Sequence, residues 1–195
     1  HYNANDAKLQ DGDLVLFDCG PDYRYYASDI TRMWPVNGRY TDEQRQLYGF
    51  MLAYHFALLK HLRPGITGEK VTELAKEEME QVAARTEWLK PAYAKAARWS
   101  LDFPWHLSHP VGMAVHDVGH YRGGELREGV VLTVDPQMRV PEERLYLRVE
   151  DTVVITADGI ENLTASAPYD MDEMEAVMRE APGAPLGAYR RAWED

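Results

Sequence analysis

The stretch FDCGPDYRYYASDITRMWPVNG, residues 17–38, holds two aspartates, Asp18 and Asp29, eleven positions apart, each at the edge of an apolar, aromatic-rich run. DLVLFDCG predicts a short buried strand that ends in a Gly-Pro turn, and YRYYASDITRMWPV predicts a second strand paired antiparallel with it. The two aspartates then lie on neighbouring strands. Since a buried carboxylate is costly unless it is paired, hydrogen-bonded or bound to a metal, we expect these strands to carry a site.

Helices follow this pair of strands. TDEQ, residues 41–44, is a capping box, and apolar residues at helical spacing continue from it until an Arg-Pro-Gly sequence at residues 63–65. A second helix is predicted over residues 69–85 and a shorter one over residues 92–99.

The pattern changes to strands after Leu107. We predict strands in VGMAVHDVG, VVLTVDP, RLYLRVED and TVVIT, a turn at ADG, and a final short helix in MDEMEAVMRE. This order predicts a single α+β domain, residues 1–195, with helices packed on one face of a curved antiparallel sheet.

Composition excludes several classes of function. The chain has 195 residues and a formal net charge of −11, which would repel nucleic acid phosphates. No apolar run approaches the roughly 20 residues that span a bilayer, and HYNANDAKLQ lacks the basic and apolar regions of a signal peptide. The single cysteine, Cys19, cannot form an internal disulfide, which fits a reducing compartment. We expect a cytoplasmic protein with neither a nucleic acid nor a membrane as its partner.

Other ionisable side chains also interrupt the apolar strands. Asp135 follows VVLTV, Glu150 follows LRV, and His109 and His116 flank PVGMAV. If the carboxylates converge, their repulsion favours protonation unless cations are present, and two divalent cations would cancel four negative charges. Oxygen ligands with one imidazole suit Mn²⁺, Co²⁺ or Zn²⁺.

A second interpretation stays open from the residues alone. Acidic residues at strand ends are commonly solvated, and Asp18 can simply belong to the Asp-Cys-Gly-Pro turn. His116 can equally be a hydrogen-bonded structural histidine. His106 and His109 form an HxxH pattern, but the flanking prolines, Pro104 and Pro110, argue against a single helix that presents both.

Taken together, several motifs in order resemble the pita-bread metallopeptidases, most closely the Xaa-Pro aminopeptidase and prolidase branch. They are HY at His1, DLVLFDCG, YYASDITRMWPVNG, HLSHPVGMAVHDVG, VVLTVDP and LRVEDTVVIT. The likeness runs from His1 to about Thr164. It implies the pita-bread fold, with this chain as the C-terminal part of the catalytic domain, lacking that domain's N-terminal half and the family's N-terminal domain.

The resemblance also implies roles for individual residues. The implied metal ligands are Asp18, Asp29, His109, Asp135 and Glu150. His1 and His116 match the family's substrate- and intermediate-binding histidines, Arg148 matches an arginine packed behind the metals, and Glu150 or Asp135 would relay a proton. We count His1, His116, Arg148 and Glu150 as catalytic.

Two departures from the family pattern concern this site. Asp135 stands where the family has a glutamate, and the lost methylene shortens its reach by over ~1 Å. Trp105 and His106 stand where the family usually has a histidine followed by glycine. His106 is therefore the candidate for the substrate contact that this histidine would make.

The implied activity is that of a dinuclear peptidase with two divalent ions, Mn²⁺ first and Co²⁺ or Zn²⁺ next. It would hydrolyse the bond between the N-terminal residue of a peptide and a following proline. Alternatives are a prolidase that acts on Xaa-Pro dipeptides and a non-catalytic pita-bread module that binds peptides or proteins. We expect a homo-oligomer, or a chain completed by an N-terminal segment or by another chain.

Overall fold

The predicted antiparallel pair of strands around Asp18 and Asp29 is present. The structure, a computed structural model, describes residue 4 and residues 6–180. β1 (Leu14–Cys19) and β4 (Ile30–Pro35) are antiparallel, and Asp18 faces Thr31 across the pair. The chain between them forms the small hairpin of β2 (Asp22–Tyr23) and β3 (Tyr26–Ala27).

The predicted second strand is interrupted at Asp29. It divides into β3 and β4, because backbone amides at the end of β3 and just before β4 bond to segments other than β1. The amide of Ala27 donates to the carbonyl of Gly112, and the amide of Asp29 donates to Thr152 Oγ1 at 3.0 Å. Asp29 thus lies at a break between strands, close to the second half of the chain.

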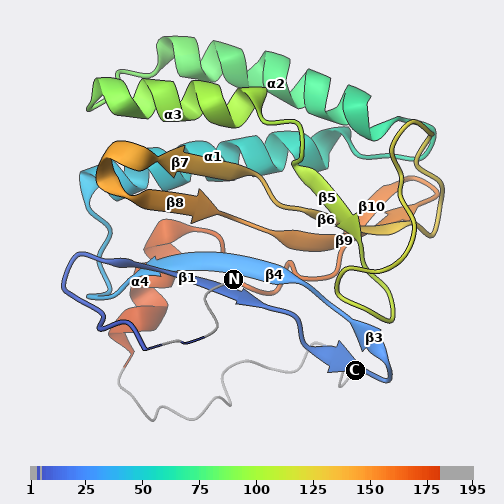
Figure 1. Ribbon diagram of the computed structural model, residues 1–195, viewed down its shortest axis with the longest axis horizontal. Coiled ribbons are helices and arrows are strands. Elements are labelled where there is room, and N and C mark those ends of the chain that lie inside the picture. Colours follow the sequence, from blue (N-terminus) through green and yellow to red (C-terminus); the bar gives the residue numbers. More distant parts are fainter. Residues whose placement is uncertain (1–3, 5, 181–195) are drawn as a thin grey trace.

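The predicted helices are present with adjusted ends: α1 (Asp42–His61), α2 (Gly68–Arg85), α3 (Pro91–Asp102) and α4 (Met171–Arg179). The capping box opens α1, since Thr41 Oγ1 accepts from the amide of Gln44 and Gln44 Oε1 accepts from the amide of Thr41. In Figure 1, α1 to α3 cover one face of the strands, and α4 lies apart from them beside β1 and β4. Among the described residues, no helix is both long enough and apolar enough to cross a bilayer.

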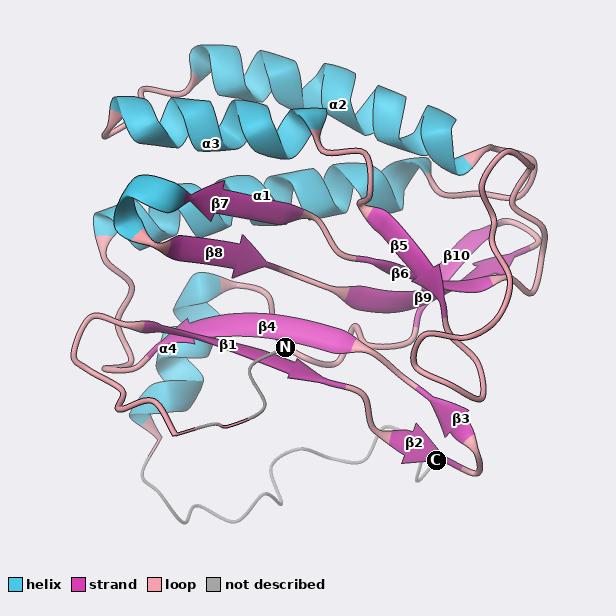
Figure 2. Ribbon diagram, viewed as in Figure 1, coloured by secondary structure: helices cyan, strands magenta, loops and turns pink. Residues whose placement is uncertain are grey.

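The second half of the chain supplies the remaining strands. They are β5 (Leu107–Pro110), β6 (Val131–Val134), β7 (Gln137–Val140), β8 (Leu145–Arg148), β9 (Asp151–Thr156) and β10 (Gly159–Asn162), with a 3-10 turn at Pro141–Glu143. β10, β9, β6 and β5 form an antiparallel sheet in that order, and β7 pairs with β8. Figure 2 shows these strands beneath the helices. The buried core lies between the two layers and includes Tyr48, Tyr54, Leu132 and Leu147.

The prediction of a strand in VGMAVHDVG, residues 111–119, is wrong. Only the preceding residues form β5, and this segment is an irregular loop. The carboxylate of Asp117 accepts from the amides of Met113 at 2.8 Å and Val118 at 2.7 Å, so a local turn replaces strand pairing. β7 and β10 were not predicted, and β7 sits between two prolines, Pro136 and Pro141, that obscure its pattern.

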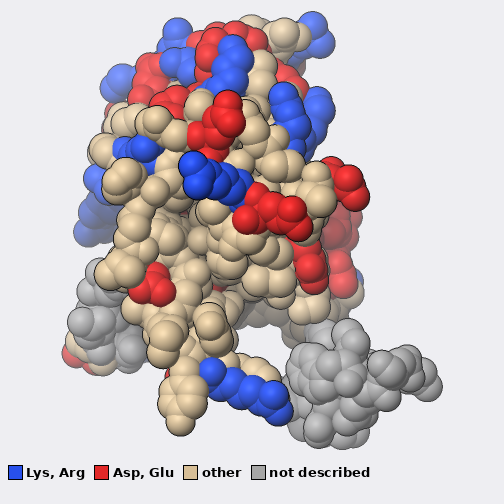
Figure 3. Space-filling model, turned by 90° about the vertical axis from the view of Figure 1, so that its right-hand side faces the viewer, with Lys and Arg blue, Asp and Glu red and all other residues tan. Residues whose placement is uncertain are grey.

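Charges are mixed on the face that carries this loop and the β2–β3 hairpin. Figure 3 shows acidic and basic side chains interspersed over the helical part of this face, while the part below it is mainly uncharged. On this face the described basic side chains form no continuous stripe of the kind that tracks a nucleic acid backbone.

Candidate metal centre

Three carboxylates from distant parts of the sequence meet beneath the helices. Asp18, Asp29 and Glu150 each offer an oxygen atom within 4.8 Å of the other two. Asp18 lies near the end of β1, Asp29 just before β4, and Glu150 between β8 and β9. The bridge between Thr31 and Glu150 joins these segments, with amide-to-carbonyl distances of 3.3 and 3.1 Å. The sequence-predicted convergence of these three residues is present.

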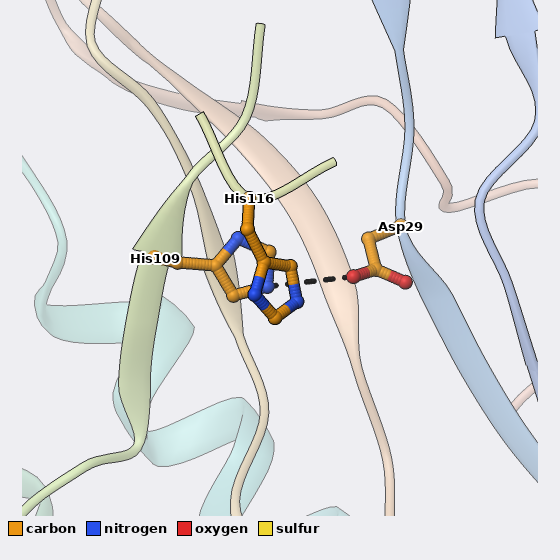
Figure 4. A group of neighbouring side chains, drawn as sticks. All are labelled: Asp29, His109 and His116. Atoms are coloured by element: carbon orange, nitrogen blue, oxygen red, sulfur yellow. Dashed lines mark ion pairs between the residues drawn. The ribbon is translucent and has the colours of Figure 1, made fainter. Parts of the chain in front are cut away.

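Two histidines complete one side of this cluster. His109 Nε2 lies 3.4 Å from Asp29 Oδ2 and 4.0 Å from Glu150 Oε1. Figure 4 shows the rings of His109 and His116 stacked beside Asp29, and their centroids are 4.0 Å apart. His109 Nδ1 lies 3.1 Å from the carbonyl of Pro110, a bond in which Nδ1 donates. Nε2, the nitrogen that faces the carboxylates, is then the one available to bind a cation.

The two histidines differ in their exposure to solvent. His109 is half-buried and Asp29 is buried, whereas His116 is exposed. A cation held by Asp29 and His109 would therefore be partly shielded from water, and the His116 ring would stand at the solvent side of it. The same arrangement gives a substrate access to His116.

Asp135 lies next to the cluster but outside its tightest group. Its side chain is only 3% exposed, and Oδ1 has no hydrogen-bond partner among the described residues. Burial first, and then the charge of Glu150, raise the pKa of Asp135 well above its ordinary value. A buried carboxylate oxygen without a hydrogen-bond partner suits a role as a cation ligand, since native proteins leave few such atoms unpaired.

The pKa values of the other carboxylates also indicate an excess of negative charge. Burial, followed by the charges of Asp29 and Asp18, raises the pKa of Glu150 to about 7, although Arg148 opposes the rise. Burial and the charge of Asp29 likewise raise the pKa of Asp18. For His109, burial lowers the pKa, but the bonds to Asp29 and to the Pro110 carbonyl and the charge of Glu150 together outweigh it, so the net shift is upward. The donor set, oxygen atoms with one imidazole, suits Mn²⁺, Co²⁺ or Zn²⁺.

Arg148 and Thr31 hold the cluster from one side. The guanidinium of Arg148 pairs with Asp18 through Nη2, lies 3.4 Å from Glu150 Oε2, and donates from Nε to Thr31 Oγ1 at 3.1 Å. Thr31 Oγ1 in turn donates to Glu150 Oε2 at 2.7 Å. Arg148 therefore contacts two of the predicted ligands, as expected of an arginine packed against the metal site.

The structure does not bring His106 to the cluster. Its side chain is fully buried, Nε2 lies 2.8 Å from the carbonyl of Ser100, and its ring packs edge-on against Tyr54. Burial lowers the pKa of His106 to about 4, so it is a neutral core residue. We therefore withdraw His106 as a substrate contact. His1, the other predicted substrate-binding residue, lies outside the described residues.

Sequence reasoning missed two threonines of the site. Besides Thr31, Thr152 Oγ1 accepts from the amide of Asp29 and donates to its carbonyl at 2.8 Å. Thr31 follows Asp29 by two positions, and Thr152 follows Glu150 by two. Period-two alternation places each threonine on the same side as the acidic residue before it, and this spacing could have identified both.

Comparison with known proteins places these residues in a family context. The model of Metallopeptidase family M24 matches residues 1–157. The Xaa-Pro aminopeptidase of Escherichia coli K12 is 39% identical over 192 residues, which cover 91% of this chain and 44% of that protein. Mouse Xaa-Pro aminopeptidase 3 is 36% identical, over 91% of this chain and 37% of its own length. The chain thus spans about two fifths of these curated relatives.

Solved structures share the fold. Proline aminopeptidase P II from Yersinia pestis has a TM-score of 0.76 and 42% identity, covering 91% of this chain and 44% of that one. A zinc-substituted E. coli aminopeptidase P in complex with product has a TM-score of 0.76 and 38% identity, with the same coverage. These matches confirm the predicted α+β class and the pita-bread fold.

Proposed function

The chain belongs to metallopeptidase family M24, and on this premise we propose that it is the metal-binding unit of an Xaa-Pro aminopeptidase. The proposed reaction is hydrolysis of the bond between the N-terminal residue of a peptide and a following proline. The observation that carries it is the buried group of Asp18, Asp29 and Glu150, whose oxygen atoms lie within 4.8 Å of one another, with His109 against it. A purely structural cluster of like charges would destabilise the fold.

Two divalent cations are the proposed cofactor, Mn²⁺ first and Co²⁺ or Zn²⁺ as substitutes. The residues proposed to hold them are Asp18, Asp29, His109, Asp135 and Glu150. When bound, the ions would polarise the scissile carbonyl and lower the pKa of water. The raised pKa values of Glu150 and Asp135 support this assignment, because a cation stabilises the charged forms that burial disfavours.

The chain's own side chains would orient the substrate and move the proton. His116, exposed and stacked on His109, is placed to donate to the oxygen that gains charge at the reacting carbonyl. Glu150 or Asp135 would relay the proton to the leaving nitrogen. Arg148 would keep Asp18 and Glu150 in place.

A cavity lies along the loop that follows β5. Its volume is ≈ 720 Å³, and Pro110, Asp117 and Tyr26 line it, whereas His109, His116 and the proposed metal ligands do not. Proline at the second position lacks an amide hydrogen and restricts the residue before it, so a shaped pocket can discriminate for it.

Peptide hydrolysis tests the activity. We would assay the chain with Mn²⁺ on a tripeptide with proline in second place, the matched tripeptide with alanine there, and an Xaa-Pro dipeptide. Cleavage of only the proline tripeptide supports an aminopeptidase, and cleavage of only the dipeptide supports a prolidase. Cations bound without cleavage of any peptide would favour a binding module. Asp102→Asn, an exposed α3 residue, serves as the matched control for Asp29→Ala and His109→Ala.

Native mass spectrometry with Mn²⁺ tests the cofactor and the assembly in one measurement. We expect two bound ions, and a mass above 22.3 kDa if the chain self-associates or is completed by an N-terminal segment or another chain. A metal-free spectrum would contradict the proposed site. The cytoplasmic location stays a prediction.

A further inference from the structure

Asp151, the residue after Glu150, is the centre of a second buried polar group. Its side chain is fully buried and accepts from donors on several elements. Oδ1 accepts from Arg32 Nη2 at 2.9 Å and Thr164 Oγ1 at 2.6 Å, and Oδ2 accepts from His55 Nε2 at 2.6 Å, Asn162 Nδ2 at 3.0 Å and Tyr169 Oη at 2.5 Å. We call this set the Asp151 hub.

The hub is connected to the backbone of Glu150 through Arg32. While Nη2 of this guanidinium binds Asp151, its Nη1 donates to the carbonyl of Glu150 at 2.8 Å and to the carbonyl of Thr31 at 3.1 Å. The guanidinium also lies over the ring of Tyr169, 4.0 Å from its centroid. Arg32 is therefore fixed on several sides and has little freedom to shift.

The two carbonyls that Arg32 binds belong to Glu150 itself and to Thr31, the residue whose hydroxyl contacts the Glu150 carboxylate. Thr31 and Glu150 pair through their backbones, and Thr31 Oγ1 donates to Glu150 Oε2. A displacement of Arg32 would loosen both carbonyls at once. The position of the Glu150 carboxylate thus depends on the hub through Arg32, whose guanidinium contacts the Glu150 carbonyl.

We propose that Asp151 and Arg32, braced by His55, are positioning residues that hold Glu150 in place and thereby set the cation affinity of the metal centre. This inference rests on the proposed function, because it assumes that Glu150 binds a cation. It assigns the hub a role beyond joining α1 to the segment after β10. Outer partners of metal ligands commonly change affinity or activity about 10–100-fold when they are altered.

Mn²⁺ titration calorimetry of the 195-residue chain tests this role. Asp151→Asn keeps the shape of the side chain, but it replaces one carboxylate oxygen by an NH₂ group that cannot accept from the donors of the hub. Arg32→Lys keeps the buried positive charge but cannot reach Asp151 and both carbonyls with one planar group. We expect each variant to weaken Mn²⁺ binding about 10–100-fold. The visible spectrum of the Co²⁺-loaded variants should also change, which a merely structural role would not produce.

Glu175→Gln is the matched control. Glu175 is also buried, at 7% exposure, and its Oε1 accepts from the amide of Tyr40 at 2.9 Å and from Arg45 at 2.7 Å. These partners lie on other elements than the metal ligands. We expect Glu175→Gln to lower the thermal midpoint without changing the Mn²⁺ dissociation constant.

Two outcomes would overturn the inference, and only one of them also overturns the proposed function. A folded Asp151→Asn chain with unchanged Mn²⁺ affinity removes the positioning role and leaves the proposed function intact. If that variant does not fold, an unchanged affinity in Arg32→Lys has the same meaning. A parent chain that binds no Mn²⁺ removes the proposed function and this inference together.

Discussion

Glu150 and Asp151 are adjacent carboxylates, equally buried, with opposite electrostatic surroundings. Glu150 is 1% exposed and its pKa is raised to about 7, whereas Asp151 is fully buried and its pKa lies far below the ordinary value. For both, burial raises the pKa. The bond to His55 and the charge of Arg32 reverse that effect at Asp151, while Asp29 and Asp18 add to it at Glu150.

The difference shows how the partners of a buried carboxylate indicate its use. Asp151 is surrounded by donors, so its charge is already compensated inside the fold. Around Glu150 the carboxylates outnumber the donors, and the orphaned oxygen of Asp135 lies nearby. Compensation there must come from bound protons or from cations that the chain does not supply. The charge of Asp151 is therefore compensated by the chain itself, and the surroundings of Glu150 support its proposed place in a cation site.

Loss of a proposed metal ligand should give the largest effect. With Asp29→Ala, we expect kcat/KM for a proline tripeptide to fall roughly 10³-fold, because a metal ligand contributes several kcal/mol to transition-state stabilisation. Steady-state hydrolysis measures it, with Asp102→Asn as the control. Unchanged activity in both Asp29→Ala and His109→Ala would remove the site assignment.

Removing the compensated charge of Asp151 should lower the stability of the metal-free chain directly. Asp151→Ala leaves the Arg32 guanidinium buried without its partner, so we expect the free energy of unfolding to fall by about 3–5 kcal/mol. Urea denaturation followed by circular dichroism, with EDTA present, measures the change. A loss below about 1 kcal/mol would mean that the hub is not a compensated buried charge, and the comparison with Glu150 would fail.

The sequence predicted most of the strands and helices that carry periodic apolar residues. Of the four carboxylates that it brought to one site, Asp18, Asp29 and Glu150 form the tight group and Asp135 lies beside it. Asp18, Asp29 and Glu150 were identifiable because each interrupts an apolar run. The Asp151 hub was not, because its donors come from residues scattered between Arg32 and Tyr169, and no short-range pattern relates them. His106 was misassigned for a similar reason: its burial against Tyr54 depends on where α1 packs.

The pH dependence of stability should separate the two carboxylates without any mutation. A rise of the Glu150 pKa from 4.5 to about 7 means that the folded chain holds a proton that the unfolded chain releases. The contribution of Glu150 to the stability of the metal-free chain is therefore complete below about pH 4.5. The free energy of unfolding then falls by about 3 kcal/mol as the pH rises from there through 7. Urea denaturation with EDTA from pH 5 to 8 measures the fall.

Three other groups near the cluster affect the same pH window. The raised pKa values of Asp18, Asp135 and His109 act in the same direction as that of Glu150. The lowered pKa of Asp151 acts only in acid, where its contribution is lost as pH falls. Glu150→Gln should flatten the dependence, and saturating Mn²⁺ should oppose it. Stability that instead rises from pH 5 to 8 in EDTA would contradict an uncompensated cluster.

The smallest effect should come from substitution of Glu78, a solvent-exposed carboxylate whose partners are similar to those of Asp151. Glu78 pairs with Lys60 at 2.8 Å and His61 at 2.7 Å, a cation and an imidazole like those at Asp151, but its side chain is 40% exposed. The bonds to Lys60 and His61 lower its pKa, yet solvent screens the pair. We expect Glu78→Gln to change the free energy of unfolding by about 0.2–1 kcal/mol in urea denaturation. A loss as large as that of Asp151→Ala would show that the number of donors, and not their burial, distinguishes the two sites.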